Sequence, residues 1–293
     1  MKILIYPNLK KKNAFKCTIE ACDILNSIGI EIFLDEGYAL EFSEKTFINF
    51  GNFDSLVKDC DVVIVIGGDG TILKCSKLVA PHYKPILGIN SGRLGFMATL
   101  ESNELESLKN LVDGHYSIVN RMMLQAKLVR ENGEIVEISA LNDVVVSKGQ
   151  QCKISDFEVS INSQIVSSLR ADGLIFSTPT GSTAYSLSAG GPIIEPDMEC
   201  IEFTQICPFS LFARTMIFSP DKILKVKFKA TKNSTITISV DGNEGINFCE
   251  NDVLFISKSN NFIKFIDIND LSFYNSINTK LMQPLKGVME VLD

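Results

Sequence analysis

One run of residues limits the fold more than any other. Val62 to Ile66 is continuously apolar, and all five residues are β-branched. A strand with one face in water alternates apolar and polar residues, whereas a strand covered on both faces is apolar throughout. Strands of the second kind lie in parallel sheets between layers of helices. The run therefore predicts an α/β layer.

The first hundred residues alternate between strand and helix patterns, as an α/β layer requires. Near-helical apolar spacing predicts a helix from Phe15 to Ile28, ended by Gly29. A crossover helix is expected from Ile72 to Val79, and a further helix from Glu101 to Val112. Strands are expected at 2–6, 30–34, 62–66 and 85–89. This order indicates βαβ units in a doubly wound or similar sheet.

After about residue 118, short alternating runs at hairpin spacing predict a mostly antiparallel β domain. Asn132-Gly133 predicts a hairpin turn, because both residues tolerate a positive φ. The expected strands are 122–129, 135–139, 144–146, 157–161, 164–168, 223–228, 235–240, 253–256 and 262–266. No low-complexity linker separates the two halves, so we expect them to pack tightly.

Composition limits the partners. The chain has 28 basic and 35 acidic residues, a net charge of −7, which argues against nucleic acid as the main partner because phosphate backbones bind basic surfaces. No stretch approaches the roughly 18–20 apolar residues of a membrane helix. The eight cysteines form no Cys-x-x-Cys pair, and only two histidines accompany them, so a zinc site is not expected. We expect a cytoplasmic protein that binds neither nucleic acid nor membrane.

The glycine loop Gly67-Gly68-Asp69-Gly70-Thr71 directly follows the buried strand and precedes the predicted crossover helix. Glycines let the backbone approach a ligand, and the unpaired N–H groups at a helix start attract anions. A carboxylate there would oppose an anion, unless it binds a metal ion or accepts a proton from an attacking hydroxyl. The alternative is a plain strand-to-helix turn with Asp69 as a helix cap.

A second loop, from Arg170 to Pro192, is dense in hydroxyl groups and glycine. Its small side chains would let a ligand approach the backbone, and Tyr185 could pack against a base or ribose. The alternative is a surface loop that links two strands, although so many small polar residues would fill a core poorly. Asn142-Asp143 and Asp241-Gly242-Asn243, each beside a predicted strand, are more simply explained as turns when taken alone.

Together these motifs resemble the NAD kinase family. Gly67 to Thr71 matches the family's GGDGT motif, Asn142-Asp143 its Asn-Glu/Asp motif, and Arg170 to Pro192 its long glycine-rich motif. The first motif is shared with lipid and sugar kinases, whereas the long motif is far more restrictive. The resemblance extends from Pro7-Asn8 to about Leu281.

The resemblance implies an α/β N-terminal domain plus an all-β C-terminal sandwich, with NAD in the cleft between them. We expect the α/β domain over residues 1–99, joined by a returning segment at about 270–293, and a mostly β NAD-binding domain over 100–269. The implied reaction phosphorylates the 2′-hydroxyl of the adenosine ribose of NAD to give NADP. The implied donor is ATP or polyphosphate, with Mg²⁺ or another divalent metal, in a homodimer or homotetramer.

The resemblance also assigns site residues. Asp69 is the expected proton acceptor from the 2′-hydroxyl. Phosphate is expected to meet Gly67, Gly68, Gly70, Thr71 and Lys74. Asn142 and Asp143 are expected at the riboses or adenine. The residues expected to hold the dinucleotide are Asp172, Thr180, Thr183, Ala184, Tyr185, Ser186, Leu187 and Ser188. Positions that contact NAD in some members, in part from a neighbouring subunit, are matched by Lys153, Arg170 and Asn243.

The chain departs from the family pattern at several positions. The stretch Pro208 to Thr215 aligns with one that commonly reads Pro-His-Thr-Leu-Ser-Ala-Arg-Pro, so Phe209, Phe212 and Thr215 replace the His, the Ser and the final Pro. Two other functions are compatible with parts of the sequence. A lipid kinase of the diacylglycerol or sphingoid type gives no reason for the long second motif, and a catalytically silent NAD(P)-binding regulator would not need Asp69.

Overall fold

The computed structural model describes residues 1–92, 95–149, 154–229, 235–268 and 277–278. The chain forms two compact units, one of Met1–Asn120 with Ile263–Asp293 and the other of Arg121–Phe262. The domain limits at 99/100 and 269/270 stay a prediction, and nearly all of the expected returning segment lies outside the described residues. No helix in the described part of the chain is both long and apolar enough to span a bilayer.

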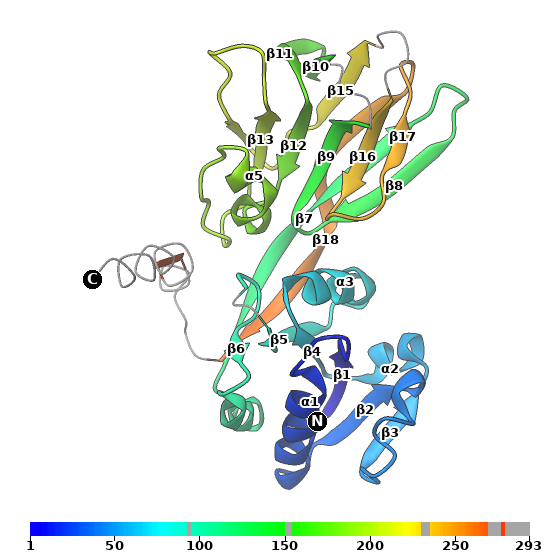
Figure 1. Cartoon of the computed structure of the whole chain (residues 1–293), viewed down its shortest axis with the longest axis vertical. Helices are drawn as coiled ribbons and strands as arrows, with labels where there is room; N and C mark the ends of the chain where they lie inside the picture. Colours follow the sequence, from blue (N-terminus) through cyan, green and yellow to red (C-terminus); the bar gives the residue numbers. More distant parts are fainter. Residues whose placement is uncertain (93–94, 150–153, 230–234, 269–276, 279–293) are drawn as a thin grey trace. The chain divides into compact units, whose positions relative to one another are not determined.

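The first unit is built on a parallel sheet with the order β3-β2-β1-β4-β5 (Figure 1). Its strands are β1 (Lys2–Pro7), β2 (Glu31–Asp35), β3 (Ile48–Gly51), β4 (Val62–Gly67) and β5 (Pro85–Asn90). Every residue of β4 is buried, and β4 lies between β1 and β5. The prediction that this strand is covered on both faces is confirmed.

Two helices cover the two faces of β4. Val62, Ile64 and Ile66 join the core that includes the buried face of α1 (Ala14–Ser27). Successive side chains of a strand point to opposite faces, so Val63 and Val65 face the other side, where α3 (Asp69–Val79) packs. Further helical segments of this unit are η1 (Glu36–Tyr38), α2 (Phe53–Asp59), η2 (Ala80–His82), η3 (Leu105–Lys109) and α4 (Asn110–Asp113).

The expected helix over 101–112 is wrong in its first turn. Glu101 ends the short strand β6 (Leu100–Glu101), which pairs with β5, and its N–H is bound by the Glu104 carboxylate at 2.8 Å. The helical segment starts only at Leu105 and ends, as expected, at Gly114, where φ is +69°.

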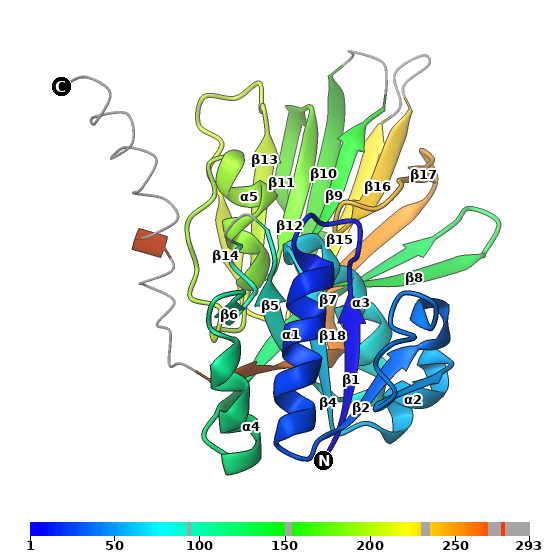
Figure 2. The same cartoon turned by 60° about the horizontal axis from the view of Figure 1, so that its bottom comes forward.

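The second unit consists of two antiparallel sheets (Figure 2), and the predicted all-β architecture is confirmed. One sheet contains β11-β10-β15-β18 together with β7 and β8, and the other has the order β14-β13-β12-β9-β16-β17. Apolar side chains from both sheets form a single core, in which Phe176 stacks on Phe203. The strands of the unit are β7 (Ser117–Val129), β8 (Ile135–Ala140), β9 (Asp143–Lys148), β10 (Ser155–Ile161), β11 (Gln164–Ala171), β12 (Gly173–Ser177), β13 (Ile201–Ile206), β14 (Met216–Phe218), β15 (Leu224–Lys229), β16 (Ile236–Val240), β17 (Ile246–Phe248) and β18 (Val253–Asp267).

Strand β18 differs from the prediction, which divided it into 253–256 and 262–266. It is one strand of 15 residues. Its beginning pairs antiparallel with β15, and Lys264 and Phe265 near its end, which belong to the first unit, pair parallel with β5. The polar residues in its middle do not interrupt it, because strand continuity depends on backbone pairing with neighbours rather than on side-chain pattern.

The β7–β8 hairpin turn has a different geometry from the expected one. Gly133 has a φ of +86°, whereas Asn132 is not among the residues with positive φ. The Asn132 side chain instead accepts a hydrogen bond from Glu134 N at 2.9 Å. This arrangement is typical of a type I turn followed by a left-handed glycine.

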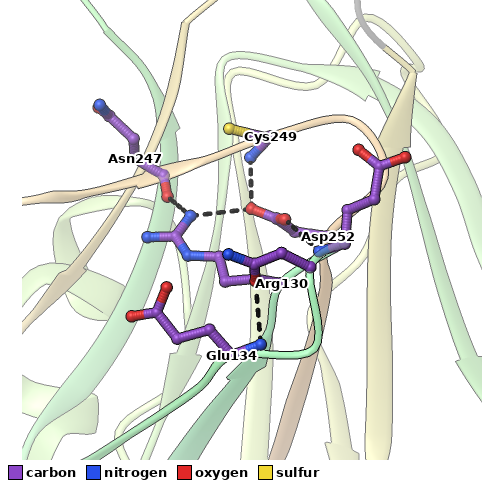
Figure 3. Close-up of polar contacts among 7 residues, drawn as sticks. Arg130, Glu134, Asn247, Cys249 and Asp252 are labelled. Atoms are coloured by element: carbon purple, nitrogen blue, oxygen red, sulfur yellow. Dashed lines mark hydrogen bonds and ion pairs between the residues drawn. The ribbon is translucent and has the colours of Figure 1, made fainter.

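Asp252 ties this turn to the end of β17 (Figure 3). Its carboxylate accepts hydrogen bonds from Arg130 Nη1 at 2.8 Å, Cys249 N at 2.9 Å and Glu131 N at 3.1 Å. The side chain is only 3% exposed. Burial by itself would raise the pKa of Asp252, but the bonds from Cys249, Arg130 and Glu131 outweigh it and lower the pKa.

Candidate functional site

The strand order of the first unit predicts where a ligand binds. Strand β1 has β2 on one side and β4 on the other, so the order reverses between β1 and β4. Ligands of open α/β sheets bind at the carboxyl ends of the strands at such a reversal. Here Asn8, which follows β1, donates from its backbone N to Ile66 O (2.9 Å) and from Nδ2 to Thr71 Oγ1 (2.9 Å). The Pro7-Asn8 turn and the glycine loop therefore meet at this point.

Asp69 is the first residue of α3, and Gly68 is its N-cap. Its carboxylate does not cap its own helix. Oδ2 accepts Phe96 N at 2.8 Å, and Oδ1 accepts Met97 N at 3.2 Å. A Cβ on Gly95 would lie 2.0 Å from Oδ1, so only glycine leaves room for the carboxylate here. The segment after β5 thus fixes the orientation of Asp69, and the helix-cap alternative does not describe its contacts.

The other residues of the loop support the same turn. Gly67 ends β4 and is buried, and a Cβ on it would lie 2.5 Å from Thr71 Oγ1. Thr71 is itself buried and donates its backbone N–H to Gly68 O at 2.8 Å. Gly68 and Gly70 have open space where a Cβ would be, and both line the adjoining pocket. The buried residues Gly67 and Thr71 therefore shape the loop, and Gly68 and Gly70 face the pocket.

The pocket at this crevice has a volume of about 1050 Å³. Among the described residues, three cationic side chains line it: Lys74 from α3, and Lys10 and Lys11 from the β1–α1 loop. Among the described lining residues, the carboxylates are Asp69 and Glu41. The pocket therefore has enough positive charge for a polyphosphate beside a carboxylate that is held in place.

Tyr38 also lines the pocket, and its hydroxyl donates to Pro7 O at 2.9 Å. Burial, followed by the negative charges of Asp35 and Glu41, raises the pKa of Tyr38, so the phenol keeps its proton. Sequence reasoning missed Tyr38, Glu41 and the two lysines of the β1–α1 loop. The available signal was the position of Lys10 and Lys11 immediately after a strand of the parallel sheet, where ligands bind.

The donor groups suit a divalent cation that is held largely by a substrate. No group of three or more His, Cys, Asp or Glu side chains in the described ranges could form a metal cage. Mg²⁺ commonly binds through one or two protein carboxylates and substrate phosphates. The part of the pocket lining that the structure describes, with two carboxylates and three cationic side chains, fits that pattern.

In the second unit, Asp241 organises the Asn142-Asp143 motif. Its Oδ1 accepts the backbone N–H of Asn142 at 2.8 Å and of Asp143 at 3.0 Å, and its Oδ2 accepts Leu141 N at 3.0 Å. Asp241 adopts a φ of +51°, in the left-handed region, to make these bonds. Taken alone, each of these polar pairs is most simply explained as a turn, whereas the structure joins them across about a hundred residues.

The hydroxyl-rich loop packs on the same motif. Thr178 accepts Gly181 N at 3.0 Å with its Oγ1, donates that hydroxyl to Leu141 O at 2.6 Å, and donates its N–H to Asn142 O at 2.9 Å. A Cβ on Gly181 would lie 2.1 Å from Asn142 O. Asn142 is 9% exposed, and its Oδ1 is buried without a hydrogen-bond partner. The Asn142 Oδ1 acceptor therefore has no hydrogen-bond donor among the described residues.

The loop continues as η4 (Thr180–Thr183) and α5 (Tyr185–Ser188). Tyr185 and Ser188 are exposed, and Thr180, Thr183, Ala184 and Leu187 are partly exposed. Ser186 differs from its neighbours because it is fully buried, and its hydroxyl donates to Glu202 Oε1 at 2.7 Å. A direct contact of the Ser186 side chain with the dinucleotide, as the resemblance implies, stays a prediction.

The remaining predicted residues in the described part of the chain have protein partners. Asp172 pairs with Lys148 at 2.6 Å, and Arg170 pairs with Asp156 at 2.7 Å across the β10–β11 pair. The side-chain hydrogen bond to Asp156 raises the pKa of Arg170. Asn243 lies in the turn after β16, where its carbonyl accepts Ser239 Oγ at 2.7 Å. Lys153 lies outside the described residues.

Comparisons with known proteins agree with these motifs. The family model described as the ATP-NAD kinase N-terminal domain matches residues 3–116, and that described as the ATP-NAD kinase C-terminal domain matches residues 141–268. The NAD kinase of Caldanaerobacter subterraneus subsp. tengcongensis is 36% identical over 283 residues, 96% of this chain and 99% of the relative. The NAD kinase of Natranaerobius thermophilus is 37% identical over 279 residues, 94% and 96% of the two chains.

Two solved structures share the fold. Yeast NADH kinase complexed with NADH superposes with a TM-score of 0.86 at 23% identity, covering 96% of this chain and 87% of the yeast chain. At that identity the likeness shows the fold alone. An NAD kinase from Archaeoglobus fulgidus in complex with ATP superposes with a TM-score of 0.70 at 25% identity, covering 94% of this chain and 96% of the archaeal chain.

Proposed function

The chain belongs to the NAD kinase family, and from this premise we propose how its residues perform the reaction. The enzyme phosphorylates NAD to NADP with ATP, so the expected activity is confirmed. The lipid-kinase and silent-regulator alternatives give no account of two family matches that together cover most of the chain. The observation that carries the site assignment is the carboxylate of Asp69, held at the edge of a cationic pocket.

Asp69 is the proton acceptor from the 2′-hydroxyl of the adenosine ribose. A carboxylate has about four acceptor positions, and Phe96 N and Met97 N use two of them. The remaining positions are available to a hydroxyl, and the two backbone bonds fix the direction from which it must approach. Phosphoryl transfer depends on such positioning and on charge neutralisation more than on covalent help from the protein.

The phosphates of ATP bind in the pocket of the first unit. Lys10, Lys11 and Lys74 supply positive charge, and the N-terminus of α3 adds its partial positive charge. Mg²⁺, held by Asp69 or Glu41 and by the donor phosphates, would neutralise charge on the group in transfer. The glycines Gly68 and Gly70 leave the backbone open to a phosphate at the same place.

NAD contacts the motifs of the second unit. The unpartnered Asn142 Oδ1 suits the amino group of adenine, which would supply the missing donor. Asp143 and the exposed side chains of the Thr180–Ser188 segment then bind the riboses and phosphates. We assign Asp172 to the dinucleotide together with the Thr180–Ser188 segment, and Lys153, Arg170 and Asn243 to further contacts with NAD, some of them made from a neighbouring subunit.

The chain forms a homodimer or homotetramer in the cytoplasm and binds neither nucleic acid nor membrane. A loop with three exposed apolar side chains supports assembly. Phe209, Leu211 and Phe212 are 76%, 89% and 88% exposed, and a second copy of the chain would remove this apolar surface from water. Sedimentation of the purified protein tests this part of the proposal, and a monomer at micromolar concentration contradicts it.

The substitution Asp69→Asn tests the catalytic role. NADP formation from ATP and NAD with Mg²⁺ should fall by a factor of about 10²–10⁴, the usual contribution of a general base. The dissociation constant of NAD, measured by calorimetry, should change far less. Asp59→Asn, an exposed carboxylate of α2 that does not line the pocket, is the matched control. Equal losses of turnover and of NAD affinity would make Asp69 chiefly a binding residue.

A further inference from the structure

Glu202 is a buried acidic residue that the reaction described above does not use. It lies on β13 and is 0% exposed. The neighbouring Phe203 belongs to the core between the two sheets, so the alternation of the strand turns Glu202 to the opposite face. A carboxyl group in such a place costs free energy unless its oxygens are hydrogen-bonded, which makes its partners informative.

Two hydroxyl groups contact one oxygen of this carboxyl group, and a third hydroxyl contacts one of those two. Ser186 Oγ and Thr204 Oγ1 lie 2.7 and 3.2 Å from Glu202 Oε1, and Ser186 Oγ lies 2.9 Å from Thr204 Oγ1. Thr204 Oγ1 in turn lies 3.0 Å from Thr215 Oγ1. The protons balance if Thr215 donates to Thr204, and Ser186 and Thr204 both donate to Glu202. Thr215 stands where the family stretch commonly has Pro, which has no hydroxyl to add to this cluster.

The cluster of Glu202, Ser186, Thr204 and Thr215 is closely packed and leaves no room for a side chain at Gly191. A Cβ on Gly191 would lie 2.2 Å from Glu202 Oε1 and 2.3 Å from Ser186 Oγ. The second oxygen, Glu202 Oε2, is buried, and no described residue forms a hydrogen bond with it. Burial raises the pKa of Glu202, and the bonds from Ser186 and Thr204 oppose that rise only in part. An apolar residue would avoid these costs, so stability alone does not explain a glutamate here.

Ser186 links the cluster to the dinucleotide loop. It is the second residue of α5, a helix of only four residues that is too short to hold its own conformation in water. Tyr185 before it is 46% exposed, and Ser188 after it is exposed. The bond from Ser186 to Glu202 is thus an anchor from the exposed loop to the rigid sheet.

We propose that Glu202 is a positioning residue for NAD, and that it acts by fixing α5 through the hydroxyl of Ser186. The inference rests on the proposed role of the Thr180–Ser188 segment in binding the dinucleotide. Glu202 touches no substrate in this scheme. Its contribution is to hold Tyr185 and Ser188 in the conformation that NAD requires, so that binding does not have to order the loop.

The test separates NAD binding from the other steps. In Glu202→Leu the KM for NAD should rise about tenfold, the effect of one lost hydrogen bond between buried groups, with the KM for ATP within about twofold of wild type. Glu202→Gln keeps an acceptor oxygen and should restore the KM for NAD to within about threefold. Ser186→Ala should reproduce the effect of Glu202→Leu, and the double variant should be no worse than either single one.

Two controls keep the outcome decisive. Phe203→Leu perturbs the same strand on its core face, so it should lower thermal stability without a selective change in the KM for NAD. Tyr185→Ala tests the loop directly. If Tyr185→Ala raises the KM for NAD and neither Glu202→Leu nor Ser186→Ala does, the inference is wrong and the proposed NAD site stands. If Tyr185→Ala also has no effect, the role of the loop fails, and the inference fails with it. If Glu202→Leu does not fold, the KM for NAD of Ser186→Ala is compared with that of Glu202→Gln. A raised KM in Ser186→Ala beside a nearly unchanged KM in Glu202→Gln supports the inference, and an unchanged KM in Ser186→Ala contradicts it.

Discussion

The Gly95→Ala substitution would displace the catalytic carboxylate without altering Asp69 itself. An added Cβ would lie 2.0 Å from Asp69 Oδ1 and 2.5 Å from Cγ. Gly95 has no left-handed φ, so the backbone itself accepts alanine. The clash is with the end of a side chain, which is able to rotate, and not with the backbone. The protein should therefore fold, but with Asp69 moved from its position.

The structure sets the size of the effect. Cβ atoms essentially never lie closer than 3.0 Å to a neighbour, so Oδ1 must move by about 1 Å, which breaks the bonds from Phe96 N and Met97 N. A misplacement of about 1 Å in a reacting group costs a factor of about 10² in rate. Stability should fall by only about 1–3 kcal/mol, because the displaced carboxylate can be hydrated in the pocket. We expect a kcat about 100-fold lower and KM values for NAD and ATP within about threefold of wild type.

Steady-state formation of NADP at saturating ATP gives kcat, and thermal unfolding gives the stability. Gly51→Ala is the matched control, because its Cβ would meet only the flexible Leu56 side chain at 3.3 Å, on β3 of the same unit. The control should retain activity. A kcat for Gly95→Ala within about threefold of wild type, beside a strongly impaired Asp69→Asn, would refute the reasoning that the segment after β5 orients the base.

Three other outcomes are expected. Asp241→Asn weakens the acceptor of three backbone N–H groups, so calorimetry should show NAD affinity reduced about tenfold with the KM for ATP unchanged; equal effects on both substrates would contradict this. Asp252→Asn should lower the free energy of unfolding in urea by about 2–4 kcal/mol at pH 7, since it leaves the Arg130 charge without its partner. The pKa of Asp252 is lowered in the folded protein. The contribution of Asp252 to stability is therefore complete above its unfolded pKa of about 3.9 and is lost as the pH falls through the folded pKa. On acidification below about pH 4, Asp252→Asn should thus lose less of its free energy of unfolding than wild type does. Glu202 has the opposite sign: its raised pKa gives stability that is complete at low pH and declines as the pH rises through the folded value, and Glu202→Gln should flatten that decline.

The parallel sheet and its glycine loop were predictable because their signals are local. A strand covered on both faces needs apolar residues at every position, and Val62 to Ile66 satisfies this within five residues. The start of α3 directly after β4 was predicted by the glycines Gly67 and Gly68, which end the strand, and by the helical spacing of the apolar residues that follow them. The family motifs are likewise short segments whose order along the chain needs no tertiary information.

Short elements with weak patterns were not predictable in the same way. The strand β3 and the helix α2 have only four and seven residues, and neither presents a clear apolar period. β18 was predicted as two strands because its middle is polar, although its backbone pairs along neighbours that lie far away in the sequence. Such pairing is decided by tertiary contacts, which override local preference.

The sequence by itself determined the class of fold, the family and the identity of Asp69, because each follows from local periodicity or from a short motif. The tertiary structure decided what holds the site together. Asp69 is fixed by N–H groups 27 and 28 residues away, and Asn142 is fixed by Asp241 at a separation of 99. It also turned Ser186 inward to Glu202 while its neighbours face outward. Hydrogen bonds between such distant residues form only once the strands are paired, and no local pattern records them.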